Sequence, residues 1–142
     1  MSTNLPSGCG VCHKRDDLMR CPECHLMRYC CQEHLDQHRT IHKTACREIR
    51  EQTSIVMESE QELRKDPANP FETLFGKFSS TRITSWYLHA NCFLLDTMKK
   101  LHTIECVEMQ LYLQERLLKL DPGDRSLTSY RRPMLLMRFP ER

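Results

Sequence analysis

The sequence predicts a small N-terminal module braced by bound metal, followed by mainly α-helical chain with a helical hairpin in its C-terminal half. Three observations predict this class. Seven of the nine cysteines and five of the seven histidines lie before residue 47. After that point apolar residues recur at helical spacing. No segment alternates apolar and polar residues as the strands of a large sheet would.

Composition explains why the first part needs a brace. Apolar residues make up 39% of the 142-residue chain, and a module of about 40 residues buries too little surface to fold unaided. The start of the chain lacks the pattern of a secretory signal, and no run of about 18 apolar residues occurs. We therefore expect an intracellular, reducing compartment, nuclear or cytoplasmic, no membrane span, and metal in place of disulfides.

The cysteine and histidine spacing predicts two closed metal sites. Two C-x2-C pairs each suit a tight turn that aims both thiolates at one point, and two further pairs are spaced i, i+4 on one helical face. Structural zinc takes four nitrogen or sulfur ligands in a tetrahedron. Eight ligands therefore make two Zn²⁺ sites per chain. The four pairs are Cys9 with Cys12, Cys21 with Cys24, Cys30 with His34, and His42 with Cys46.

Spacing alone leaves open which pairs share an ion. Sequential, nested and interleaved pairings all satisfy it. A rival set, Cys21, Cys24, His38 and His42, would make a single two-Cys-two-His finger that binds nucleic acid. That finger leaves four cysteines unexplained, and its recognition helix would carry Glu33 and Asp36 but no basic residue, which disfavours phosphate and base contacts.

Charge also argues against nucleic acid. The formal net charge is +2 with neutral histidines. Six thiolates would add six negative charges and two Zn²⁺ four positive ones, which brings the zinc-loaded chain close to neutral. No overall electrostatic attraction to nucleic acid is expected.

With Tyr29 before Cys30 and Lys43 after His42, residues 9–46 resemble a MYND-type zinc finger. The resemblance implies an interleaved cross-brace, which carries over in the following way. Zinc 1 would be held by Cys9, Cys12, Cys30 and His34, and zinc 2 by Cys21, Cys24, His42 and Cys46. His34 stands where most members have cysteine, and imidazole is an ordinary zinc ligand. A RING-type module fits less well, because it ends in two cysteine pairs.

The resemblance implies a protein-protein interaction module, an adaptor or regulatory protein, whose partner is a peptide or a helical segment. Many members grip proline-containing peptides with Gln and Trp, but this chain has Leu35 and Arg39 at those positions. No enzyme is expected, since a closed zinc site has no position for substrate. The alternative is a fragment of a lysine methyltransferase that carries this finger. The chain's four glycines and lack of strand patterns disfavour that catalytic domain.

After the module, residues 47–66 are predicted to be a helix. The helical pattern begins at Thr44, with a thin apolar stripe of Ala45, Ile49, Val56 and Leu63. Residues 67–80 are a linker and aromatic turn, since Pro67 and Pro70 interrupt the helix. Phe71, Phe75 and Phe78 are expected to dock one aromatic face.

Residues 81–120 are predicted to form an α-helical hairpin. Its first helix would be capped by Ser79, Ser80 or Thr81 and bury Ile83, Trp86, Tyr87, Ala90, Leu94, Met98 and Leu101; its second would be capped by Thr103. Asp121-Pro122-Gly123 ends it. Residues 121–142 are expected to be a basic tail or a truncated helix, with an apolar run at 134–139. The linker at 67–73 resembles helical regions that follow this finger in uncharacterised fungal proteins, which continue further.

Three cysteines outside the eight ligands are expected to be structural. Cys31 lacks a ligand at its i+4 position, where Leu35 stands, and is predicted to be a spare thiol. Cys92 borders the apolar run 93–95 and is predicted to pack with it. Cys106 lies in the first turn of the second hairpin helix, with no other reactive residue near it in sequence.

Overall fold

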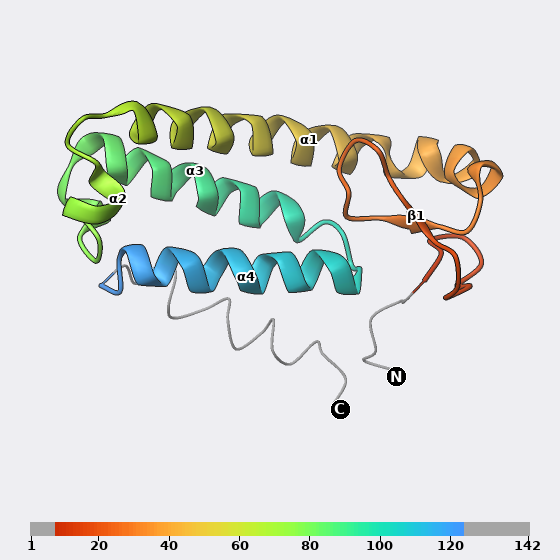
Figure 1. Ribbon diagram of the computed structural model, residues 1–142. Helices are drawn as coiled ribbons and strands as arrows, with labels where there is room; N and C mark the ends of the chain where they lie inside the picture. Colours follow the sequence, from red (N-terminus) through yellow and green to blue (C-terminus); the bar gives the residue numbers. More distant parts are fainter. Residues whose placement is uncertain (1–7, 124–142) are drawn as a thin grey trace.

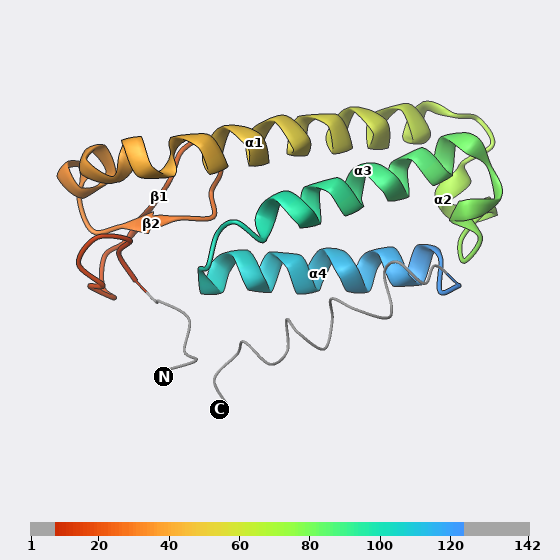
Figure 2. The same ribbon diagram turned by 180° about the vertical axis from the view of Figure 1, so that it is seen from behind.

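The computed structural model describes residues 8–123 (Figure 1). The elements, in chain order, are β1 (Met19–Arg20), β2 (Arg28–Tyr29), α1 (Gln32–Lys65), α2 (Pro70–Thr73), a 3-10 turn (Phe78–Ser80), α3 (Arg82–Met98) and α4 (Ile104–Leu120). Both views show α3 between α1 and α4, with the β-hairpin beside the first turns of α1 (Figure 2). No helix in this described part is long and apolar enough to cross a membrane.

Helix α1 is the longest element and belongs to both halves of the molecule. It begins at Gln32, inside the cysteine and histidine block, so the predicted start at residue 47 was wrong. Its 34 residues include neither glycine nor proline, which leaves nothing to end the helix between the two halves. Five buried side chains recur every seven residues on its inner face: Leu35, His42, Ile49, Val56 and Leu63. The predicted apolar stripe is confirmed and extends back into the cysteine and histidine block.

The linker after α1 reverses the chain and packs against the end of the helices that is remote from the cysteine and histidine block. Asn69 adopts a left-handed conformation (φ 48°) before Pro70 starts α2. The Phe71 ring packs on Phe78 and Tyr87, with centroids 5.3 and 5.7 Å away, and the Arg64 guanidinium lies over it. Phe75 is 58% exposed, so the expected docking of all three phenylalanines was wrong for that residue.

The predicted helix caps are confirmed for α3 and α4. The Thr81 hydroxyl accepts a hydrogen bond from the Thr84 backbone N–H, and the Thr103 hydroxyl accepts one from Cys106. The predicted buried face of α3 was partly wrong, because Ile83 and Trp86 are 62% and 54% exposed.

Polar side chains occupy core positions in α3 and α4. In α3 these are Thr84 and Asn91, whose polar groups donate to the backbone carbonyls of Phe78 and Tyr87. In α4, Gln110 and Gln114 are buried. Donation to a backbone carbonyl lowers the cost of burying a polar group.

The β-hairpin is attached to the start of α4. The Thr103 hydroxyl donates to the Leu26 carbonyl at 2.9 Å, and Arg28 pairs with Glu105 at 3.1 Å. Lys100, in the turn between α3 and α4, pairs with Glu48 of α1. The N-terminal module is therefore connected to the helical hairpin in two ways: through the chain, by α1, and through these contacts with the start of α4. The predicted tail over 121–142 lies outside the described residues beyond Gly123.

Candidate metal centres

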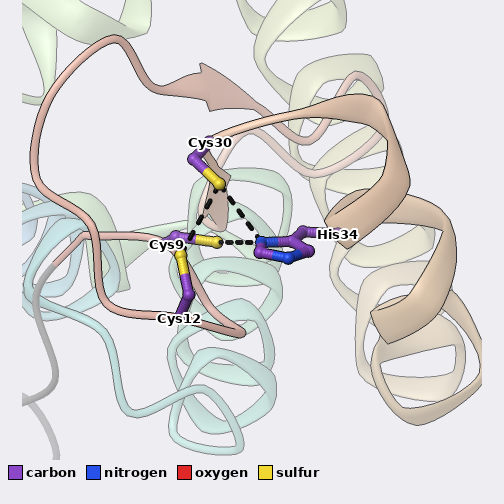
Figure 3. Close-up of side chains that lie close together, drawn as sticks. All are labelled: Cys9, Cys12, Cys30 and His34. Carbon is purple, nitrogen blue, oxygen red and sulfur yellow. Dashed lines mark hydrogen bonds between the residues drawn. The ribbon is translucent and has the colours of Figure 1, made fainter.

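The first centre lies where the N-terminal turn meets the start of α1. The side chains of Cys9, Cys12, Cys30 and His34 converge on one point (Figure 3). The Nδ1 atom of His34 lies 3.1 Å from the Cys30 Sγ and 3.5 Å from the Cys9 Sγ, and the Cys12 and Cys30 Sγ atoms are 3.6 Å apart. Cys12 is exposed, so this centre borders solvent.

The second centre is buried under α1. It brings together Cys21 and Cys24, from the turn between β1 and β2, with His42 and Cys46 from α1. The Nε2 atom of His42 lies 3.2 Å from the Cys24 Sγ, and the Cys21 and Cys46 Sγ atoms are 3.7 Å apart. All four residues are buried, in contrast to the first centre.

The spacing of these atoms fits tetrahedral zinc. Zn–S bonds of about 2.3 Å and Zn–N bonds of about 2.0–2.1 Å place neighbouring ligands about 3.6–3.8 Å apart in a tetrahedron. In each centre the four ligand atoms lie within 4.8 Å of one another. A disulfide needs an S–S distance of about 2.05 Å, and all nine cysteines are free. The interleaved grouping is the one that the resemblance implied.

The two C-x2-C turns share one backbone design. In each, the residue after the second cysteine is a histidine in the left-handed conformation, with φ of 64° at His13 and 61° at His25. Its N–H donates to the carbonyl of the first cysteine, at 3.0 Å in both turns. Both imidazoles are exposed. These histidines close the turns through their backbones.

The pKa values of the thiols in the first centre indicate that a bound cation is required for all three to ionise. Burial raises the pKa of Cys9, but backbone N–H groups of Cys12, Val11 and Cys30 outweigh it and lower that pKa to about 5. Burial and the neighbouring Cys12, Cys31 and Cys9 thiols raise the pKa of Cys30 to about 12. Three adjacent thiols cannot all ionise beside one another without a positive charge. A divalent cation would remove this repulsion, and coordination deprotonates thiols outright.

In the second centre the pKa values of the thiols are again shifted in opposite directions, lowered at Cys21 and raised at Cys46. Burial and the charge of Cys24 raise the pKa of Cys46. Burial, followed by the nearby His38, lowers the pKa of His42 below its usual value. A neutral imidazole is the form that coordinates a metal.

The rival two-Cys-two-His set is not brought together. His38 lies outside both clusters. Its Nδ1 is hydrogen bonded to the Tyr29 hydroxyl at 2.8 Å, and its ring stacks on His42 with centroids 6.0 Å apart. Cys31 also lies outside both clusters, with its Sγ 3.8 Å from that of Cys30. His38 therefore supports a ligand, a role that spacing alone did not indicate.

A surface pocket of about 260 Å³ opens beside the second centre. Tyr29, Leu35 and Pro22 give it apolar walls, and Arg39, Lys43 and Glu23 add charged groups to its lining. Arg39 pairs with Asp36, and Glu23 pairs with Arg50, while the described residues include no ion-pair partner for Lys43. The ligands Cys21, His42 and Cys46 form the rest of the lining, so an intact second centre is needed to keep the pocket's shape.

Comparison with known proteins agrees with this geometry. Residues 9–46 match the family model described as the MYND finger. No curated protein matches the chain, and no solved structure does. The match begins at the first ligand and ends at the last, and within it lie two groups of three cysteines and one histidine. Residues 9–46 are therefore a MYND-type zinc-binding module with two Cys3His sites, followed in this chain by a mainly helical region.

Proposed function

We propose that this protein is an adaptor or regulatory protein that holds a peptide segment of a partner protein in the pocket beside the second zinc centre. MYND modules typically mediate protein interactions, and the pocket is the observation that carries the proposal. It combines apolar walls with the charged side chains of Arg39, Lys43 and Glu23, next to a metal-braced support. Sites held on such a support bind with less ordering cost than mobile loops do.

The pocket's chemistry favours a peptide with one apolar anchor and a neighbouring carboxylate. Leu35 and Tyr29 suit an aliphatic side chain, and Lys43 offers an ammonium group. Leu35 and Arg39 occupy the positions where proline-binding members carry Gln and Trp, so this chain lacks an aromatic platform for stacking a proline ring. We therefore expect weak or no binding of proline-rich peptides.

No catalytic step is part of the proposal. Each centre has four protein ligands, which leaves no coordination position for a substrate or an activated water. The zinc ions would act on folding, by supplying stability that so small a module cannot obtain from its apolar core. Zinc-thiolate ligands also require reduced cysteines, so we place the protein in a reducing, intracellular compartment.

The test is titration of the ¹⁵N-labelled, zinc-loaded full chain with synthetic peptides, followed by NMR. Three peptides of equal length would carry a leucine flanked by aspartates, a leucine flanked by lysines, and a proline-rich sequence. We expect the aspartate peptide to shift the amide signals of Leu35, Arg39 and Lys43. Lys43→Glu should weaken that binding about tenfold or more, while Lys119→Glu, a matched change on α4, should not. If none of the peptides shifts those amides, the pocket is not a peptide site.

A further inference from the structure

A second concave surface lies far from the zinc centres, between α1 and α3. It is a groove of about 760 Å³ lined by Ile55, Glu58, Ser59, Gln61 and Glu62 of α1 and by Ile83 and Trp86 of α3. Ile83 and Trp86 are 62% and 54% exposed, and Phe93, two turns further along α3, is 57% exposed. Large apolar side chains gathered along one helix in this way mark a contact surface.

The groove is acidic along one wall. Glu58 and Glu62 stand on the α1 side, where Glu62 pairs with Lys65. On the α3 side, Arg82 lies beside Trp86. A matching segment therefore needs apolar side chains for the floor and positive charge directed toward α1.

The chain itself contains such a segment. Residues 131–139 read Arg-Arg-Pro-Met-Leu-Leu-Met-Arg-Phe, an apolar run with arginines on both sides. They lie outside the described residues. Residues 125–142 include five arginines and one glutamate, and this excess of positive charge complements the α1 wall.

The end of the described chain puts that segment within reach. The Asp121 carboxylate accepts a hydrogen bond from the Ser79 backbone N–H at 2.6 Å, which fixes the end of α4 beside the start of α3. Met134 lies eleven positions after Gly123, and extended chain covers about 3.3–3.6 Å per residue, or roughly 36 Å here. Ile83 is the second residue of α3, so the groove begins close to the point from which the segment starts.

We propose that residues 131–139 dock in the groove between α1 and α3, with their apolar side chains on Ile55, Ile83 and Trp86 and their arginines facing Glu58 and Glu62. The docked segment is an intramolecular ligand. It covers a face that would otherwise be open to a second copy of the chain. This docking is independent of the peptide pocket beside the zinc centre, which lies at the other end of α1.

Trp86 is the chain's single tryptophan, and it reports on the groove directly. The experiment compares the full chain with a Leu135→Asp/Leu136→Asp variant by emission wavelength and acrylamide quenching. We expect the parent emission to lie at shorter wavelength, and the quenching constant to rise at least twofold in the variant. Ser126→Asp/Thr128→Asp adds the same charge outside the apolar run and should leave both quantities unchanged. Equal quenching in the parent and the leucine variant would overturn the proposal.

Exchanging the charges of the segment and of the α1 wall tests whether residues 131–139 occupy the groove. Arg131→Glu/Arg132→Glu should raise the quenching of Trp86, and adding Glu58→Arg/Glu62→Arg to it should restore the parent value. Failure of this rescue would contradict the assigned contact. Light scattering across a range of protein concentrations separates the alternative: protection of Trp86 that rises with concentration alongside a doubled mass would show that a second copy fills the groove. Zinc content and circular dichroism establish that each variant is folded.

Discussion

Cys30 and Cys31 are neighbours in sequence, and the structure gives them different roles. Cys30 belongs to the first metal cluster, whereas Cys31 is the residue that precedes α1 and lies outside both clusters. The i, i+4 spacing distinguished the two cysteines from the sequence alone, because His34 can complete a ligand pair with Cys30, whereas Leu35 cannot do so with Cys31. The pairing of the four ligand pairs was not accessible in this way. It depends on which ligand pair each C-x2-C turn meets in the folded chain, which local spacing does not determine.

Substitution of these two cysteines should have unequal effects on metal content. Cys30→Ala removes a ligand of the first centre, and Cys46→Ala one of the second, so each variant should hold one zinc ion instead of two. Cys31→Ala should hold two, because its thiol is not a ligand. Elemental analysis of protein purified without chelator measures this. Loss of zinc from the Cys31 variant with retention in the Cys30 variant would shift the ligand set by one residue.

Two glycines with nearly the same backbone angle offer a matched comparison. Gly8 (φ 85°) precedes the first ligand, and an added Cβ would lie 2.3 Å from the Lys14 carbonyl oxygen; Gly76 (φ 83°) has nothing within 4 Å. Gly76→Ala should cost about 1 kcal/mol for the left-handed conformation alone. Gly8→Ala should cost about 2 kcal/mol more, since backbone must shift.

The Gly8 variant should also release zinc faster, because the Cys9 N–H donates to that same Lys14 carbonyl. Urea unfolding and the rate of zinc transfer to a coloured chelator measure the two effects. Equal losses in the Gly8 and Gly76 variants would mean that the turn around Lys14 relaxes without cost.

Among the elements, the sequence predicted the helices better than their buried faces. In α3 an apolar count selects Ile83 and Trp86, whereas the fold leaves both exposed and buries the polar residues Thr84 and Asn91. These polar residues can be buried because the backbone carbonyls of Phe78 and Tyr87 accept hydrogen bonds from them. The start of α1 at Gln32 was missed although the i, i+4 ligand pairs already implied helix there. The predicted helix start was placed at residue 47, where the composition changes, but the helical backbone continues through that point.

Helices α1 and α4 are joined by a charge contact that should depend on pH. Glu60 accepts from Arg116 at 2.5 Å and from Arg64 at 3.0 Å. Partial burial raises the pKa of Glu60, but these guanidinium groups outweigh it and hold that pKa below its ordinary 4.5. Because the folded-state pKa is depressed, the contribution is complete above about pH 4.5. It is lost as the pH falls through the folded-state value.

Glu60→Gln should therefore lower the free energy of unfolding by about 1 kcal/mol at pH 6, with the gap to the parent narrowing toward pH 3. Urea unfolding of both chains across this range gives the gap directly. Zinc release at acid pH affects both chains alike and cancels in the difference. A gap that stays constant with pH would show that the charge on Glu60 contributes nothing.

For the whole molecule, the structure places metal ligands and helical core on one continuous helix. His42 shares its buried stripe with Ile49, Val56 and Leu63, and the β-hairpin is attached to α4 through Leu26 and Thr103. The far end relies on Phe71, Phe78 and Tyr87. This aromatic cluster contains no metal ligand, so the two ends differ in what stabilises them.

Zinc removal should consequently produce a graded loss of structure. Excess chelator should open the module and the first turns of α1, because these depend on the coordinated side chains. Residues around the aromatic cluster should keep their protection, since local opening does not require them to separate. Hydrogen exchange of the full chain, with and without chelator, measures this by residue. Simultaneous loss of protection in α3 would show that the molecule unfolds as one cooperative unit.

Because α1 is continuous, it also fixes the distance between the peptide pocket and the groove. Arg39 borders the peptide pocket and Glu58 borders the groove. The two residues are 19 positions apart, which corresponds to roughly 29 Å along the helix axis at 1.5 Å per residue. A single bivalent partner that occupied both surfaces would need a connecting stretch of at least about nine extended residues. A linker of about that length would raise the effective concentration of its second segment most strongly, and a shorter one would abolish simultaneous engagement.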